Sequence, residues 1–310
     1  MILLAYLSAT VLSFYLLAKT CERFFIPALD QISKKLNLSS DVAGATLMAV
    51  GSSAPELFIS IISLLKPGNH EAIGMGTIVG SALFNLLVII GAAAAFRPIT
   101  AAWRPIVRDS AFYAISIGIL ILAFHDGQIL LYEALGFIIL YVIYVFTVLK
   151  WKSASVEKDA PAPLNERTFK QTWLIFSGSI IALALLSWVL VESAIGIAQI
   201  LHVPEAIIAL TILAIGTSIP DTISSVIVAR QGRGNMAITN AIGSNVFDIL
   251  FGLGMPWFLA LVFLRPQIPV KNAELDSSVL LLFSSIILIF ALFLIQRWHL
   301  RKWSGYLLIL

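Results

Sequence analysis

Long apolar runs separated by short polar intervals fill most of the chain. They lie at about 2–18, 42–65, 72–95, 110–125, 128–149, 172–198, 204–229, 236–263 and 277–296. A helix of about 20 such residues crosses the roughly 30 Å hydrocarbon core of a bilayer. A tenth run opens at about residue 303, but the 8 residues from Trp303 to Leu310 make only about 12 Å of helix at 1.5 Å per residue. The pattern predicts an all-α polytopic membrane protein with about ten transmembrane helices. The tenth is either truncated or ends without a full span, and we expect truncation.

The first apolar run, from Ile2 to Ala18, also has the character of a signal peptide. It lacks a basic segment before it and an A-x-A-like cleavage site after it. We therefore interpret it as the first spanning helix, which could continue through Cys21 to Ala28.

The longest polar interval, from Lys150 to Thr172, is too short for a soluble domain and is interpreted as a linker. It divides the chain into a first half at 1–150, a linker at 151–171 and a second half at 172–310, with five helices in each half.

Two stretches of the chain match each other. Residues 42–65 and 72–91 carry GSSAPE and GSALFN, and residues 207–229 and 236–254 carry GTSIPD and GSNVFD. The pairs are Gly51/Gly216, Ser53/Ser218, Pro55/Pro220 and Glu56/Asp221 at an offset of 165, and Gly80/Gly243, Ser81/Ser244, Phe84/Phe247 and Asn85/Asp248 at an offset of 163. Five spans separate the copies, so they cross the membrane in opposite directions. Two inverted five-helix repeats with interrupted helices are typical of a transporter that binds its substrate near the midplane.

The small number of charged residues supports a membrane protein, and their distribution predicts its orientation in the membrane. The chain is 59% hydrophobic and only 12% charged, with a net charge of +3 and a mean hydropathy of +0.97. With the N-terminus outside, the loops on the linker side carry 17 Lys and Arg residues and the other side carries 3. Because basic residues favour the cytoplasm, we expect a cytoplasmic linker and an external N-terminus. The lone Cys21 permits no disulfide within the chain.

Two acids lie about halfway through apolar runs. Glu56 and Asp221 have no basic residue near them in sequence, and a carboxylate at that depth costs about 2.5–3.5 kcal/mol on insertion scales. A bound cation would offset this cost, whereas the alternative is a protonated acid bonded to a neighbouring helix. Pro55 and Pro220 precede the acids, and each should free a helix carbonyl four residues earlier.

The polar groups near these acids are all oxygen donors, which suits calcium with its 6–8 oxygen ligands. The four histidines fall in loops or at helix ends, and we interpret them as interfacial, like Glu192 and Glu133. Ser81 and Asn85, and likewise Ser244 and Asp248, are i, i+4 neighbours on one helix face. Helix–helix hydrogen bonding is the alternative role for Ser81 and Asn85. Asp248 is a third intramembrane acid, which suggests a further monovalent cation or proton site.

At these residues the sequence resembles the calcium/cation antiporter superfamily. GSSAPELF, GTIVGSALFN, GTSIPD, VARQGRGNMA and GSNVFD are most similar to the potassium-dependent sodium/calcium exchangers. The resemblance implies an antiporter with alternating access, in which the first and sixth helices move against the repeats. It implies calcium ligands at Glu56 and Asp221 and ion-lining hydroxyls at Ser52, Ser53, Thr217 and Ser218. It further implies sodium ligands at Ser81, Asn85, Ser244 and Asp248 and ligating carbonyls at Ala49 and Ala214.

The resemblance sets the expected function and leaves alternatives open. We expect sodium/calcium exchange in a lipid bilayer, in the cell membrane, with no cofactor, no nucleic-acid partner and no enzymatic activity. Asp248 matches an acid tied to potassium use, but potassium-independent relatives also carry it, so potassium co-transport stays open. The linker is too short for calcium-sensing domains. Proton/calcium exchange is the first alternative and a passive cation channel the second, and the sequence gives no oligomeric state.

Overall fold

The computed structural model describes residues 2–25, 27–28, 31–32, 40–151, 168–230, 232, 234–270 and 273–309. Within these residues, seven helices are long and apolar enough to cross a membrane, and there are up to nine spans if each of two bent helix pairs counts as one. These nine elements occupy the nine complete runs predicted above. Most of the predicted linker, residues 152–167, lies outside the described residues.

The helices of the first half are α1 (Ile2–Thr20), α3 (Ser40–Ala43), α4 (Ala49–Ser52), α5 (Ala54–Leu65), α6 (Glu71–Phe84), α7 (Ile90–Phe96), α8 (Trp103–Phe124) and α9 (Leu131–Lys150). Those of the second half are α10 (Phe169–Leu201), α11 (Glu205–Ile208), α12 (Ala214–Thr217), α13 (Ile219–Arg230), α14 (Gly234–Phe247), α15 (Gly254–Phe263), α16 (Ala273–Ile295) and α17 (Lys302–Ile309). Five π-helical segments continue or join them: η1 (Cys21–Phe25), η2 (Gly44–Met48), η3 (Asn85–Ile89), η4 (Ala209–Leu213) and η5 (Asp248–Leu253).

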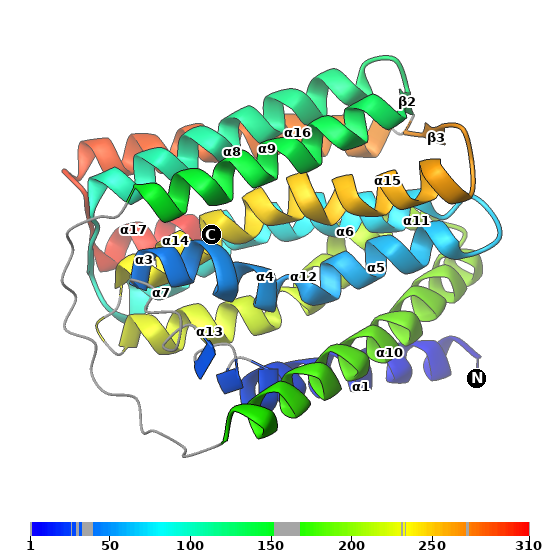
Figure 1. The fold of residues 1–310 in the computed structure, drawn as a ribbon, viewed down its shortest axis with the longest axis horizontal. Coiled ribbons are helices and arrows are strands. Elements are labelled where there is room, and N and C mark those ends of the chain that lie inside the picture. The colour runs from blue at the N-terminus through cyan, green and yellow to red at the C-terminus, as the bar shows by residue number, and fades with distance from the viewer. Residues whose placement is uncertain are drawn as a thin grey trace.

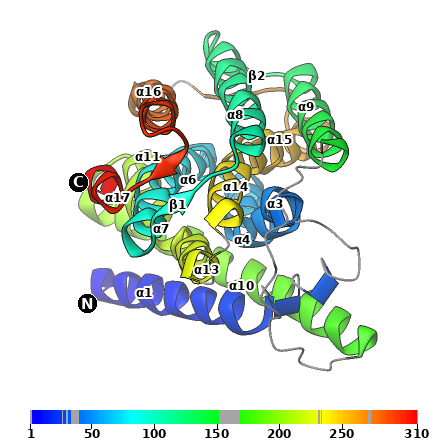
Figure 2. The same ribbon diagram turned by 90° about the vertical axis from the view of Figure 1, so that its left-hand side faces the viewer.

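The helices form three layers (Figures 1 and 2). The helices α1 and α10 lie side by side along one edge, and α8, α9 and α16 cover the opposite edge. The bent pairs α4/α5 and α12/α13 lie between these layers together with α6 and α14. Many side chains of α1 and α10 that face outward are large and apolar, as expected where a helix meets lipid.

Short antiparallel ladders tie the loops of the two halves together. Strand β1 (Ile99–Thr100) pairs with β4 (His299–Leu300), and β2 (Gln128–Ile129) pairs with β3 (Ile268–Pro269). Each ladder therefore joins a loop of the first half to a loop of the second, and one ladder lies at each end of the bundle (Figures 1 and 2).

Two glycines bring the straight central helices against the π-helical segments. A Cβ atom on Gly243 of α14 would lie 2.8 Å from the Cα atom of Ala45 in η2. A Cβ atom on Gly80 of α6 would lie 2.6 Å from the Cβ atom of Ala214 and 3.0 Å from the carbonyl carbon of Leu210 in η4. Only glycine permits so close an approach, and small residues at membrane helix interfaces serve this purpose. The two matching motifs thus make the same contact.

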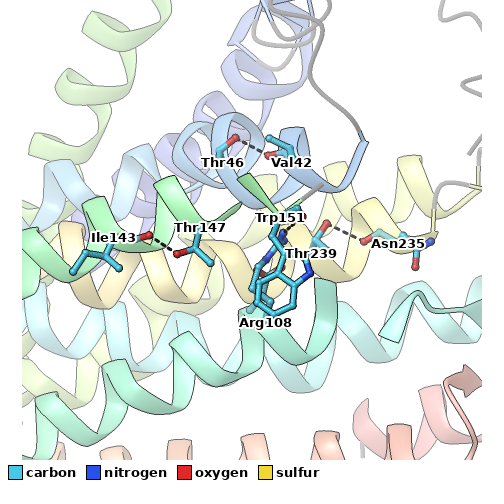
Figure 3. Close-up of polar contacts among 9 residues, drawn as sticks. Val42, Thr46, Arg108, Ile143, Thr147, Trp151, Asn235 and Thr239 are labelled. Carbon is cyan, nitrogen blue, oxygen red and sulfur yellow. Dashed lines mark hydrogen bonds and ion pairs between the residues drawn. The ribbon is translucent and has the colours of Figure 1, made fainter. Parts of the chain in front are cut away.

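Several threonine hydroxyls are hydrogen-bonded within their own helix, and the side chains of Thr46 and Thr239 are buried. Thr46, Thr147 and Thr239 each donate to the carbonyl four residues earlier, at 2.6, 2.8 and 2.9 Å (Figure 3). Such bonds neutralise the cost of a hydroxyl in an apolar environment.

The fourth span begins earlier than the predicted 110–125. Helix α8 starts at Trp103 and includes Arg108 and Asp109, whose charges placed this turn outside the predicted helix. The two side chains are buried and form a two-pronged ion pair, with N–O distances of 2.7 and 3.1 Å. Arg108 also donates to the carbonyl of Trp151 at the end of α9 (Figure 3). Each charge satisfies the other, so the helix continues through them.

Candidate functional site

Two bent helices meet at the centre of the bundle. The segments Gly44–Ser52 and Ala54–Leu65 are inclined by 50°, and Glu205–Thr217 and Asp221–Arg230 by 41°. In Figure 1 the first pair runs from left to right and the second from right to left. The GSSAPE and GTSIPD motifs therefore lie on helices that run in opposite directions.

Each bent helix leaves regular geometry two residues before its proline. Ser53 leaves helical geometry, with φ −89° and ψ 8°, and α5 restarts at Ala54. Pro55 thus lies in the first turn of a new helix, where a missing N–H group costs nothing. Ser218 occupies the matching break at φ −79° and ψ −1°. Polar backbone groups at such a break are available for other partners.

π-helical segments flank the breaks at matching positions of the two halves. Segments η2 and η4 precede the breaks, and η3 and η5 begin at Asn85 and Asp248. Segments η2 and η4 are separated by the same offset of 165 residues as the first pair of motifs, and η3 and η5 by the same offset of 163 as the second pair. Since π-helical turns are rare and often mark functional sites, their repetition beside the acids indicates a shared role.

Each central acid contacts polar groups from both halves of the chain. Glu56 accepts a hydrogen bond from Ser81 of α6 at 3.2 Å and lies beside Thr217 of α12. Asp221 accepts one from Ser244 of α14 at 3.4 Å and lies beside Ser52 of α4. Both acids are fully buried. The two environments correspond residue by residue under the sequence match.

The hydroxyls beside the acids each have a helix carbonyl as a second possible acceptor. Ser52 donates to the carbonyl of Met48 at 2.8 Å, and Thr217 donates to that of Leu213 at 3.0 Å. Each hydroxyl therefore lies between a helix carbonyl and a carboxylate, and its lone pairs remain available to a cation.

Bonds between the halves close the site. The hydroxyls of Ser81 and Ser218 are 2.9 Å apart. The Asn85 amide donates to Asp221 at 3.2 Å and to Asn245 at 3.0 Å. Ser81 and Asn85 therefore face the acids rather than serving only as links between helices.

Asp248 is fully buried, and neither of its carboxylate oxygens has a hydrogen-bond partner. Ser53 lies beside it, and its own hydroxyl oxygen also lacks a partner. Within the described part of the chain, no basic side chain pairs with Asp248 or Glu56. The expected third acid therefore lies beside the break in α4/α5.

The predicted carbonyl ligands are engaged within their helices. The Ala49 carbonyl accepts from the Ser53 N–H at 3.0 Å, and the Ala214 carbonyl accepts from the Ser218 N–H at 3.2 Å. An ion ligated by these oxygens would share them with the last turn before each break.

The two acids interpreted above as interfacial have structural partners. Glu192 pairs with Lys66, which also lies over the Trp188 ring. Glu133 accepts a hydrogen bond from the N–H of Leu130 at the start of α9, at 2.8 Å. Neither belongs to the central site.

Asn245 is the central residue that sequence reasoning missed. It is fully buried, accepts from Asn85 and donates to the carbonyl of Ala82 at 3.0 Å. The only signal is its place directly after Ser244, because its counterpart in the first motif is the apolar Ala82. A comparison of the two motifs therefore does not reveal Asn245.

Buried acids at the meeting point of two interrupted spanning helices define a cation transporter. The profile of the sodium/calcium exchanger protein family matches residues 6–150 and 171–310. The chain belongs to this family, and the resemblance predicted from the motifs is confirmed. Its members are transporters of the membrane rather than enzymes.

Similarity to known exchangers extends over almost the whole chain and is consistent with this family. Human sodium/potassium/calcium exchanger 4 is 27% identical over 96% of this chain and 78% of its own length. Human sodium/potassium/calcium exchanger 5 is 29% identical over 97% of this chain and 79% of its own length. The solved sodium-calcium exchanger NCX_Mj has a TM-score of 0.68 and 23% identity, covering 99% of this chain and 96% of its own. The solved H+/Ca2+ exchanger CAX has a TM-score of 0.80 and 17% identity, covering 98% of this chain and 80% of its own.

Proposed function

We propose that this protein is a secondary active antiporter that exchanges sodium for calcium by alternating access. Calcium and sodium are its substrates, and Glu56 and Asp221 neutralise them in turn. The surrounding ligands are those predicted from the motifs, namely Ser52, Ser53, Thr217, Ser218, Ser81, Asn85, Ser244, Asp248 and the carbonyls of Ala49 and Ala214.

Unpartnered oxygen atoms carry this proposal. Ten buried side-chain nitrogen or oxygen atoms in the described part of the chain lack a hydrogen-bond partner, and six of them are oxygens of Ser53, Glu56, Asn85, Asn240 and Asp248. A buried polar atom without a partner costs about 1–3 kcal/mol. Concentrating six acceptor-capable oxygens in one region is therefore costly, unless a cation binds them.

The ligand chemistry favours calcium and sodium over transition metals. In the described residues, no three His, Cys, Asp or Glu side chains gather closely enough to hold a metal ion by themselves. Hydroxyl, amide and carbonyl oxygens must supply the remaining ligands, as hard cations prefer. One Ca²⁺ or two Na⁺ would balance the two central carboxylates, so the ions should compete.

We further propose that the chain consists of two inverted five-helix repeats, with α17 as the start of the tenth helix. The opposite directions of the bent pairs, the matched π-helical segments and the crossed β ladders support this arrangement. We propose that the linker is cytoplasmic, that the N-terminus is external and that the protein resides in the cell membrane, on the basis of the distribution of basic residues.

Calcium uptake into proteoliposomes tests the exchange. Vesicles loaded with sodium and diluted into sodium-free buffer with calcium should accumulate calcium, and an outward proton gradient without sodium should not drive uptake. Uptake driven by the proton gradient alone would instead identify a proton/calcium exchanger. Calcium flux that needs no counter-ion would identify a channel.

Substitution of the acids tests the site. Glu56→Gln and Asp221→Asn should each abolish uptake while the protein elutes as a folded species. Glu192→Gln is the matched control, because Glu192 lies outside the site and pairs with Lys66, and it should retain uptake. Full activity of either central variant would refute the site.

Potassium dependence is a separate measurement. If Asp248 holds a potassium ion, potassium will stimulate sodium-driven uptake by the unaltered protein, and Asp248→Asn will remove the stimulation. If potassium has no effect, we assign Asp248 to a sodium ion or a proton.

A further inference from the structure

We propose that Asn245 is a positioning residue that fixes the orientation of the Asn85 amide, so that the Asn85 Oδ1 atom points to the transported ion. The inference rests on the proposed function, because it assumes that Asn85 is an ion ligand. It adds a residue that the match between the two repeats does not reveal.

The hydrogen bonds around Asn245 have one consistent direction. The carbonyl of Ala82 can only accept, so Asn245 must present its Nδ2 group there, at 3.0 Å. Its Oδ1 atom then faces Asn85 and must receive a hydrogen from Asn85 Nδ2, also at 3.0 Å. A backbone group of α6 thus determines the orientation of a side chain on α14, and that side chain determines the orientation of Asn85.

These hydrogen bonds fix the orientation of the Asn85 side-chain amide. Its amide group offers two hydrogens, and both are used, one on Asn245 and one on Asp221 at 3.2 Å. Its Oδ1 atom is buried and has no hydrogen-bond partner. Without Asn245, one amide hydrogen would lack an acceptor and the amide could rotate, exchanging the oxygen for the nitrogen at the site.

Asn245 itself is not placed as a ligand. Its Oδ1 and Nδ2 atoms are both engaged, by Asn85 and by Ala82. It supports a ligand in the way that an outer-shell partner orients a metal-binding side chain, and loss of such a partner typically weakens metal affinity about 10- to 100-fold.

A double-mutant cycle tests the coupling. Sodium and calcium half-saturation concentrations are measured in proteoliposomes for the unaltered protein, Asn245→Ala, Asn85→Ala and the double variant. Asn245→Ala should raise a half-saturation concentration about tenfold. In the Asn85→Ala background the same substitution should have almost no effect, because there is no amide left to orient.

Asn235→Ala is the control for a purely structural loss. Asn235 lies on the same helix and accepts a hydrogen bond from the Ala102 N–H at 2.6 Å, away from the acids. This variant should melt at a lower temperature without a change in half-saturation. If Asn245→Ala does not fold, Asn245→Ser replaces it, because a serine hydroxyl can bond the carbonyl of its own helix but is too short to hold Asn85.

The outcomes separate the two proposals. An equal fold-change from Asn245→Ala in both backgrounds would overturn the positioning role and leave the site intact. Unchanged half-saturation in Asn85→Ala alone would remove Asn85 from the ligand set, and the positioning role would fall with it. A change that disappears in the Asn85→Ala background would support the proposal.

Discussion

Replacing Gly243 by alanine tests whether close packing on the π-helical segment holds the centre together. The added Cβ atom would lie 2.8 Å from the Ala45 Cα atom, 3.0 Å from its carbonyl oxygen and 3.2 Å from its carbonyl carbon. All three are backbone atoms, so no side-chain rotation relieves the overlap. Helix α14 must move away from η2, and Ser244, the next residue, must move with it.

The expected change in the stability of the Gly243→Ala variant is the sum of two opposing contributions. Overpacking of this kind typically costs about 1–3 kcal/mol, whereas alanine is favoured over glycine inside a helix by about 1 kcal/mol. Gly178→Ala on α10 carries only the helix-propensity term, because no atom outside its own helix backbone lies within 4 Å of the added Cβ. The difference between the two variants should therefore be about 1–3 kcal/mol, with Gly243→Ala less stable.

The assay is thermal unfolding of the detergent-solubilised protein, followed by calcium uptake of the reconstituted variants. Gly243→Ala should melt several degrees below Gly178→Ala and should need more calcium for half-maximal uptake, because Ser244 donates to Asp221. Equal melting temperatures for the two variants would show that the α14–η2 contact is not tight. The packing argument for both glycine motifs would then be refuted.

Three further substitutions probe separate parts of the structure. Ser81→Ala removes a donor to Glu56, and since a hydrogen bond to a charged group contributes about 1.5–3 kcal/mol, the calcium half-saturation concentration in uptake assays should rise about tenfold or more. Arg108→Ala leaves a buried Asp109 carboxylate without its ion-pair partner and should lower stability by about 3–5 kcal/mol, seen as loss of monodisperse protein in size-exclusion chromatography. Lys66→Ala breaks an ion pair in which the acid is half-exposed, and its melting temperature should hardly change because such pairs contribute about 0–1 kcal/mol.

The spans and the two central acids could be predicted from the sequence for a clear physical reason. An apolar run long enough to cross the hydrocarbon core is typical of a membrane helix. Glu56 and Asp221 stand out because each lies deep in such a run beside glycine and proline. The start of α8 could not be predicted, because hydropathy counts Arg108 and Asp109 as separate charges and does not register that they neutralise each other.

The local geometry of the site was less predictable. Proline indicated that the helix is interrupted near Pro55, but not that it breaks at Ser53 and restarts at Ala54. The π-helical segments have no sequence signature that separates them from ordinary helix. Asn245 was missed because the match between the repeats directs attention to residues that both copies keep, whereas its bond to the Ala82 carbonyl exists in one copy only.

The crossed contacts at the centre restrict how access to the proposed site could alternate. Glu56 lies beside Thr217 of the other bent helix, and Asp221 lies beside Ser52. Separating the two bent helices would therefore dismantle the surroundings of both acids at once, and the ion would lose most of its ligands while it is being moved. The helices α1 and α10 lie together at one edge (Figure 2), and none of the predicted ligands lies on them. Movement of α1 and α10 across an intact centre could open the two sides in turn, which favours these helices as the moving part of the exchanger.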